Sequence, residues 1–83
     1  MNHVELLAVL LAAIKSLGYQ VREEELDENC HGICSFGSQK YLFLDSRMSP
    51  EEKVEHALES MGQLSEEEQK ALPPKVRRLL SGG

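Results

Sequence analysis

The sequence GICSFGSQKYLFLD, at residues 32–45, predicts two β-strands joined by a short turn. The first of these strands spans residues 32–36, the turn is Gly37-Ser38-Gln39, and the second strand spans residues 40–45. The second strand is apolar on both faces, which is typical of a strand inside a sheet or one covered by helices on one side and a partner on the other. Since side chains alternate along a strand, Tyr41 and Phe43 share one face, which we expect to be the outer one.

The segment before this hairpin predicts a helix over residues 2–17 and a strand over residues 19–23. One set of apolar side chains in the helix recurs at helical spacing: Leu7, Leu10, Leu11, Ile14 and Leu17. Most of its other positions are apolar too, including Leu6 and Val9, which is typical of a buried helix. Gly18 supplies the left-handed residue that ends the helix, and the segment after it alternates apolar and polar residues as a half-buried strand does.

The segment after the hairpin predicts one long helix and one or two short ones. Ser49-Pro50-Glu51-Glu52 has the pattern of a capping box, and it opens a helix that runs to about Met61. Ser65-Glu66-Glu67-Glu68 repeats the pattern and opens a short helix to about Leu72. Pro73-Pro74 breaks that helix, and Pro74 can begin a last turn or two.

These elements predict a single α+β domain over residues 1–83, in which the last three residues are loose. Its parts are an N-terminal helix, a small and mostly antiparallel three-stranded sheet with helices on one face, and the C-terminal helices. The chain has 83 residues, of which 41% are hydrophobic, which is enough for one modest core.

The balance of charges argues against two classes of function. Fourteen acidic residues outnumber nine basic ones, which gives a net charge of −5, whereas a nucleic-acid-binding face needs an excess of cations. The basic cluster Lys75, Arg77 and Arg78 is typical of the last turn of a helix. A membrane-spanning helix needs about 18 consecutive apolar residues, and the longest apolar run covers only residues 6–14. This run follows Glu5 with no basic residue before it, unlike a signal peptide, so we expect a cytoplasmic protein with no membrane partner.

The cluster Cys30-His31-Gly32-Ile33-Cys34 contains residue types that bind zinc. A closed zinc site needs four ligands, and His3 and His56 are the remaining soft donors, both distant in sequence. We therefore expect no metal or other cofactor, with Cys34 a small core residue on a strand. The alternative is a small metal- or redox-responsive protein that uses Cys30, His31 and Cys34.

No catalytic residues are predicted, because a Cys–His pair would lack a third group to orient it and no other catalytic motif is present. The first helix carries more apolar surface than so short a chain can cover. The sequence therefore predicts a non-enzymatic protein–protein interaction or homodimerisation module, whose partner is a second copy or another protein. The candidate contact residues are Leu6, Val9, Tyr41 and Phe43. The alternative for these four is simple burial under the C-terminal helices.

The stretch from residue 32 to residue 62 resembles the hairpin-plus-helix element of ImmA/IrrE-type bacterial zinc peptidases. Residues 40–45 resemble that family's apolar strand, and Leu58-Glu59-Ser60-Met61-Gly62 falls where its H-E-x-x-H motif would fall. Glu59 matches the general base, but Leu58 and Gly62 replace the two zinc-binding histidines, so the resemblance implies the fold element, or a degenerate peptidase-like domain, without the activity. With Gly32-Ile33-Cys34 and Leu72-Pro73-Pro74, the whole chain is also similar to small bacterial proteins of unknown function.

Overall fold

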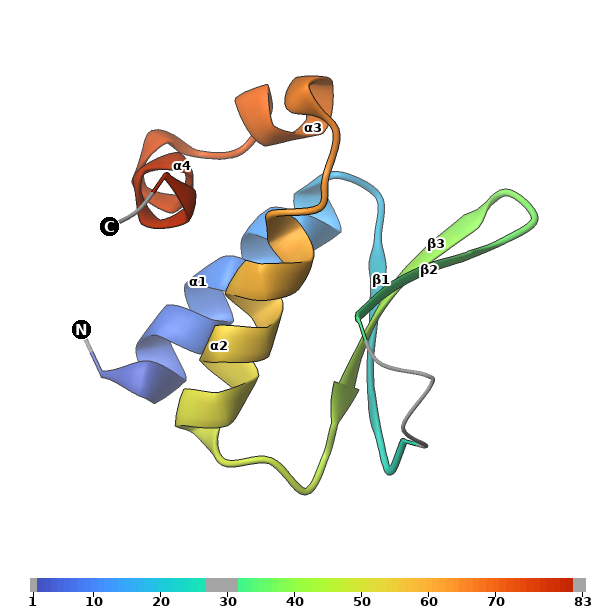
Figure 1. The fold of residues 1–83 in the computed structure, drawn as a ribbon, viewed down its shortest axis with the longest axis vertical. Coiled ribbons are helices and arrows are strands. Elements are labelled where there is room, and N and C mark those ends of the chain that lie inside the picture. The colour runs from blue at the N-terminus through green and yellow to red at the C-terminus, as the bar shows by residue number, and fades with distance from the viewer. Residues whose placement is uncertain (1, 27–31, 82–83) are drawn as a thin grey trace.

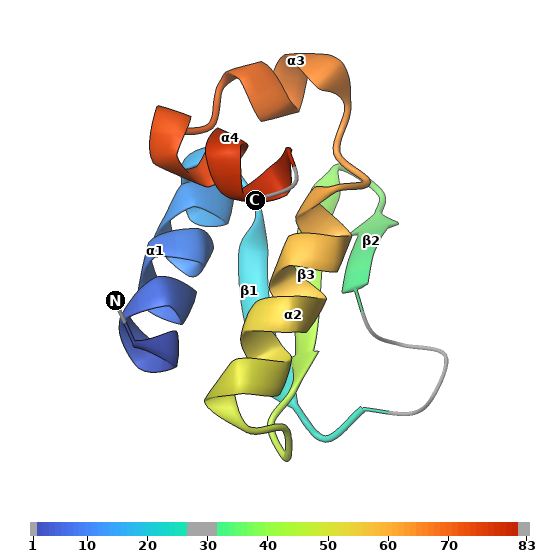
Figure 2. The same cartoon turned by 60° about the vertical axis from the view of Figure 1, so that its left-hand side comes forward.

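The computed structural model describes residues 2–26 and 32–81, and the α+β class predicted from the sequence is confirmed (Figure 1). In chain order the elements are α1 (His3–Ser16), β1 (Gln20–Glu24), β2 (Gly32–Phe36), β3 (Gln39–Asp45), α2 (Pro50–Met61), α3 (Glu66–Lys70) and α4 (Pro74–Leu80). The helices lie on one side of the sheet, with α1 and α2 packed side by side (Figures 1 and 2). Of the last three residues, which we expect to be loose, Ser81 caps α4 and its backbone N–H donates to the Arg77 carbonyl at 3.1 Å, whereas Gly82 and Gly83 lie outside the described residues.

The sheet is mixed rather than mostly antiparallel, and β3 is its central strand. The strand order is β1-β3-β2, in which β3 pairs antiparallel with β2 and parallel with β1. The hairpin accounts for the antiparallel pair. β1 also runs opposite to β2. Because β2 runs opposite to β3 as well, β1 and β3 run in the same direction and pair in parallel. The central place of β3 agrees with its apolar residues on both faces.

The hairpin between β2 and β3 closes on two residues, Gly37 and Ser38, not on the three that the sequence suggested. Phe36 is paired with Gln39, and Gly37 has a φ of +64° while no non-glycine residue in the described ranges has a positive φ. This combination matches a type II′ turn, which places glycine at its first central position. The difference of one residue in the turn decides which face of the sheet each residue of β2 occupies.

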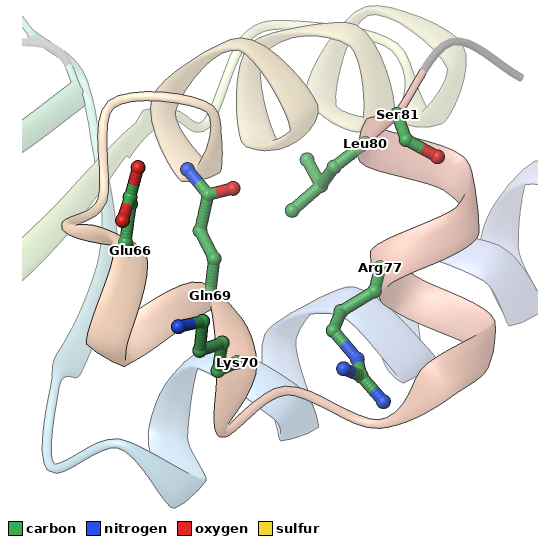
Figure 3. Close-up of a pocket in the computed structure, with 6 residues that line it drawn as sticks. All are labelled: Glu66, Gln69, Lys70, Arg77, Leu80 and Ser81. Carbon is green, nitrogen blue, oxygen red and sulfur yellow. The ribbon is translucent and has the colours of Figure 1, made fainter.

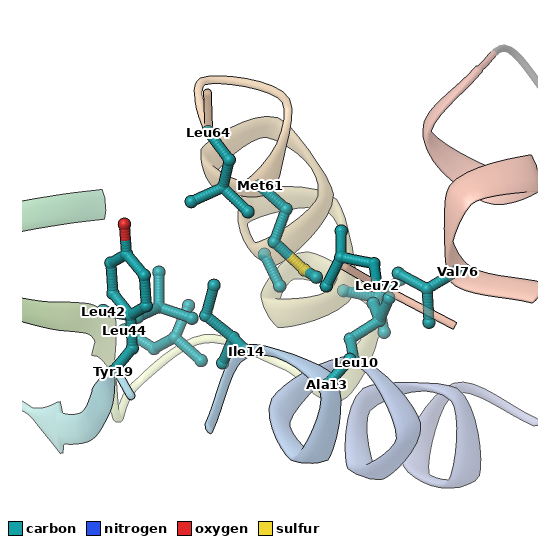
Figure 4. Close-up of a cluster of buried hydrophobic side chains, with 12 residues drawn as sticks. Leu10, Ala13, Ile14, Tyr19, Leu42, Leu44, Met61, Leu64, Leu72 and Val76 are labelled. Carbon is teal, nitrogen blue, oxygen red and sulfur yellow. The ribbon is translucent and has the colours of Figure 1, made fainter. Parts of the chain in front are cut away.

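The core lies between the sheet and the helices. Ile14 and Met61 stand between the sheet residues Leu42 and Leu44 and the C-terminal Val76 (Figure 4). The buried apolar residues of this core are Leu10, Ala13, Ile14, Tyr19, Leu42, Leu44, Val54, Ala57, Met61, Leu64, Leu72 and Val76. Because Leu42 and Leu44 face the helices, the alternating residues of β3 face the opposite way.

Helix α1 buries only one of its faces. Asn2 caps it by accepting a hydrogen bond from the Glu5 backbone N–H at 2.8 Å, and Gly18 follows its end with a φ of +94°. Leu10, Ala13 and Ile14 are buried, whereas Val4 is 63% exposed. The other large apolar side chains of this helix, Leu6, Leu7, Val9 and Leu11, are half-buried against the core.

The C-terminal segment is docked on the core. Both predicted capping boxes form, at Ser49 with Glu52 and at Ser65 with Glu68. Pro74 then occupies the first turn of α4, and Val76 from this helix is fully buried. Among the described residues, no helix is both long enough and apolar enough to cross a bilayer.

Candidate functional site

Three aromatic side chains form a cluster on the face of the sheet that no described helix covers. Tyr41 and Phe43 come from β3 and are stacked, with ring centroids 5.6 Å apart. Phe36 comes from β2 and meets both rings edge-on, with its centroid 5.8 Å from that of Tyr41 and 6.5 Å from that of Phe43. We name Phe36, Tyr41 and Phe43 the aromatic surface. It holds three of the chain's four aromatic residues.

The aromatic surface is partly open to solvent. Phe36 is 62% exposed, and Tyr41 and Phe43 are half-buried. The helix layer, which includes the C-terminal helices, lies against the other face of the sheet, so the half-burial of these two rings does not come from it (Figure 1). The rings are in contact with one another. Burial of Tyr41 and Phe43 under the C-terminal helices, the alternative reading of the sequence, is therefore wrong.

Charged residues beside the aromatic surface are paired with one another. Arg22 on β1 lies beside Phe43 in register, and its Nη2 is 2.6 Å from Glu24 Oε2. Arg47 Nη2 is 2.6 Å from Asp45 Oδ2, and the Arg47 backbone N–H donates to Asp45 Oδ1 at 2.9 Å. The hydrogen bonds from Arg47 hold the pKa of the Asp45 carboxyl well below its usual range. The edge of this surface therefore carries balanced charges rather than a positive field.

Cys34 is not the core residue that the sequence predicts. The two-residue turn places it opposite Tyr41, on the face of the aromatic surface, where its thiol is free and half-buried. The other two members of the predicted metal or redox cluster, Cys30 and His31, lie outside the described residues. Within residues 2–26 and 32–81, no three or more His, Cys, Asp or Glu side chains are grouped in a way that could hold a metal ion.

The four predicted contact residues occupy two separate places. Tyr41 and Phe43 belong to the aromatic surface, whereas Leu6 and Val9 lie on α1, in the layer on the other side of the sheet (Figure 1). Leu6 and Val9 are partly buried and pack against the edge of the core. The structure therefore does not bring these four residues into one site.

Phe36 is a member of the aromatic surface that the sequence analysis did not select. With a three-residue turn, Phe36 would pair with Lys40 and lie on the helix-facing side of the sheet. The two-residue turn pairs it with Gln39 instead and places it on the side of Tyr41 and Phe43. The signal that could have shown this is Gly37-Ser38, since glycine followed by serine is a recognised two-residue hairpin loop.

A cleft of about 290 Å³ lies between α3 and α4 (Figure 3). Its lining consists of Glu66, Gln69, Lys70, Arg77, Leu80 and Ser81. Charges of both signs line it, and its two helices are only 5 and 7 residues long. In the described part of the chain, every buried side-chain nitrogen or oxygen has a hydrogen-bond partner, so no orphaned polar group points to a ligand here.

A polar cluster joins the sheet to the start of α3. The Tyr19 hydroxyl donates to Glu68 Oε2 at 2.9 Å, and Lys40 Nζ lies 3.5 Å from the same oxygen and 5.5 Å from the centre of the Tyr19 ring. Burial, together with the bond to Glu68, raises the pKa of Tyr19 to about 12. Burial alone would raise the pKa of Glu68, but the hydrogen bonds from Tyr19 and Ser65 and the charge of Lys40 lower it.

We expect Tyr19→Phe to lower the free energy of unfolding by about 1–2 kcal/mol near neutral pH, because it removes a hydrogen bond to a charged group. The loss should shrink in acid. Folding lowers the pKa of the Glu68 carboxyl from its unfolded value, near 4.5. The stability that this carboxyl contributes is therefore fully present above the unfolded pKa, and it is lost as the pH falls through the folded pKa. Urea unfolding at about pH 7 and about pH 3 measures both effects.

Tyr41→Phe is the matched control, since it removes the hydroxyl of the other tyrosine. Its effect on the free energy of unfolding should be the same at both pH values. A loss for Tyr19→Phe that is equally large in acid would contradict a role for ionised Glu68.

The segment that resembles the zinc peptidase motif is the end of α2. Glu59 is exposed there, Leu58 is partly buried, and Gly62 is the residue that caps the helix. Comparison with known protein families, with characterised proteins and with solved structures finds no match to this chain.

Proposed function

We propose that the protein is a non-enzymatic, cytoplasmic interaction module that associates with a second copy of itself through the aromatic surface. The observation that carries the proposal is the contact of Phe36, Tyr41 and Phe43, ring against ring, on the face of the sheet opposite the helices. Large exposed aromatic side chains are enriched where proteins bind one another and are scarce on other surfaces.

The charges favour a protein partner over a nucleic acid. Sheets that bind single-stranded RNA also present aromatic side chains, but they combine them with cations that contact the phosphates. Here Arg22 is paired with Glu24 and Arg47 with Asp45, and the whole chain has a net charge of −5. Binding of a second copy does not require such cations, because contacts between apolar rings need no excess charge.

Phe36→Ser is expected to weaken self-association at least tenfold, because it removes the most exposed ring of the aromatic surface. Light scattering or sedimentation equilibrium over about 10 μM to 1 mM protein measures the dissociation constant. Oligothymidylate or oligouridylate added to the same samples tests the nucleic-acid alternative, and we expect no binding.

Val4→Ser is the matched control. Val4 is 63% exposed and Phe36 is 62% exposed, but Val4 lies on α1, in the layer on the other side of the sheet. Its substitution should leave the dissociation constant unchanged. A chain that stays monomeric throughout would overturn the proposal. A dimer that Val4→Ser weakens and Phe36→Ser does not would also overturn it, and would move the contact to the exposed side of α1 that carries Val4.

A further inference from the structure

The sheet, as far as the described residues form it, has two edges that differ in how they are protected. Both β1 and β2 are edge strands, because β3 lies between them. β1 carries Arg22, Glu23 and Glu24, and charged residues on an edge strand discourage pairing with another strand. β2 reads Gly32-Ile33-Cys34-Ser35-Phe36, with neither a charge nor a proline. The edge of β2 is therefore the one open to a further strand.

We propose that two copies of the chain join through the edges of β2, antiparallel about a two-fold axis at Cys34, so that two three-stranded sheets form a single sheet of six strands. This inference rests on the proposed function and specifies the geometry of the self-association.

The register of the hairpin leaves backbone N–H and C=O groups of β2 free to bond to a second strand at this edge. Residues that flank a two-residue loop form a hydrogen-bonded pair, and hydrogen-bonded and non-hydrogen-bonded pairs alternate from there. Since Phe36 pairs with Gln39, Cys34 also bonds to β3. Ile33 and Ser35 therefore direct their N–H and C=O groups away from β3, to the outer edge.

The side chains of β2 are complementary to a second β2 in this arrangement. A two-fold axis at Cys34 places Ile33 opposite Ser35 of the second copy, and Gly32 opposite Phe36 of the second copy. The most exposed ring of the aromatic surface thus meets the residue that has no side chain. Aromatic residues opposite glycine are a known means of fixing the register of paired strands.

The aromatic surface continues across the boundary between the two copies. Gly32 pairs with Phe43 inside its own sheet. A Phe36 ring from the second copy that lies over Gly32 therefore points to Phe43, and the rings of the two copies form one row. The position of Gly32 is fixed by the backbone as well, because its φ of +92° disfavours any other residue.

The interface is small, which sets the conditions of the experiment. Five residues of β2 from each copy make an edge contact at the low end of specific interfaces, below about 1,200 Å² in total. We therefore expect a dissociation constant above about 1 μM, and masses must be measured up to about 1 mM protein.

Ser35→Pro tests the edge directly. Proline removes the N–H that points to the second copy and leaves the bonds between β2 and β3 in place, which is the situation in which an edge strand tolerates proline. The dissociation constant should rise at least tenfold, whereas Ser35→Thr should leave it unchanged. Circular dichroism of the monomer shows whether the hairpin variant remains folded.

Cross-linking at Cys34 provides a second measurement that does not depend on proline. In a Cys30→Ser background, Cys34 is the single thiol of the chain. Opposed residues of a non-hydrogen-bonded antiparallel pair have Cα atoms about 4.5 Å apart, within the range of a disulfide. Added diamide should then join two Cys34 thiols as a disulfide and take up the two hydrogen atoms that they lose.

The control for this cross-link combines Cys34→Ser with Ser38→Cys in the same background, which moves the single thiol to the exposed turn and away from the axis. Thiols at the turn can meet only by random collision in the proposed dimer. Cys34 should therefore cross-link at least tenfold faster than the thiol of this control variant.

The outcomes separate the two proposals. Edge pairing is overturned if Phe36→Ser weakens the dimer while Ser35→Pro leaves it intact and Cys34 shows no preferred cross-link. The two copies would then pack face to face, with their sheets about 10 Å apart. A chain that is monomeric up to about 1 mM overturns both proposals. Should Ser35→Pro fail to fold, the ratio of the two cross-linking rates decides the question alone.

Discussion

Leu42→Ala is expected to lower the free energy of unfolding by about 3–4 kcal/mol, the largest effect of any single truncation in the sheet. Leu42 is fully buried on the central strand β3, between Val21 of β1 and Ile33 of β2. Removing its side chain leaves a cavity where both pairs of strands and the helix layer meet. Since a domain of this size has a total stability of about 5 kcal/mol, the variant should be only marginally folded.

Urea unfolding followed by circular dichroism measures this change, with Val4→Ala as the control. Val4 is also aliphatic but is 63% exposed, so its truncation should cost less than about 0.5 kcal/mol. A loss below about 1 kcal/mol for Leu42→Ala would contradict the central position of this residue in the core.

Val76→Asp is expected to detach α4 from the core. Val76 is fully buried, and no other residue of α4 is buried to this extent. A carboxylate in its place would have no partner, and burying a charge without one costs several kcal/mol, so the helix should leave the core rather than keep the charge inside. The free energy of unfolding should fall by about 3 kcal/mol or more.

Limited digestion with trypsin reports on the docking of α4, because Arg77 and Arg78 lie on this helix. In the native chain the helical backbone protects these sites, whereas Val76→Asp should expose them and speed cleavage at least tenfold. Lys75→Asp makes a larger change of charge at the exposed neighbouring position. It removes the trypsin site at Lys75 but should not alter the rate of cleavage after Arg77 and Arg78, which is the rate to be compared. Equal rates for the two variants would show that Val76 does not hold the helix.

The helices could be predicted from the sequence because their signals are local. Each capping box lies within four consecutive residues, at Ser49 to Glu52 and at Ser65 to Glu68, and both form as expected. The glycine at position 18 likewise ends α1 through its own backbone conformation. Such signals do not depend on where the rest of the chain lies.

The sheet was harder to predict because its pairing is not local. The parallel pairing joins Gln20 to Tyr41, and no pattern within β1 shows which strand it will meet or in which direction. The contact between Tyr19 and Glu68 spans 49 positions for the same reason. At the candidate site, alternation along β3 was enough to place Tyr41 and Phe43, whereas Phe36 depended on the length of the turn.

The strand order also governs how this chain can fold as it leaves the ribosome. α1 and β1 emerge first, but the strand that β1 pairs with in the described sheet is β3, which begins at Gln39. The β2–β3 hairpin can close as soon as its own residues are available, because its partners are adjacent in the chain. β1 therefore stays unpaired until the hairpin has formed, and the apolar face of α1 stays exposed until α2, its main packing partner, has followed.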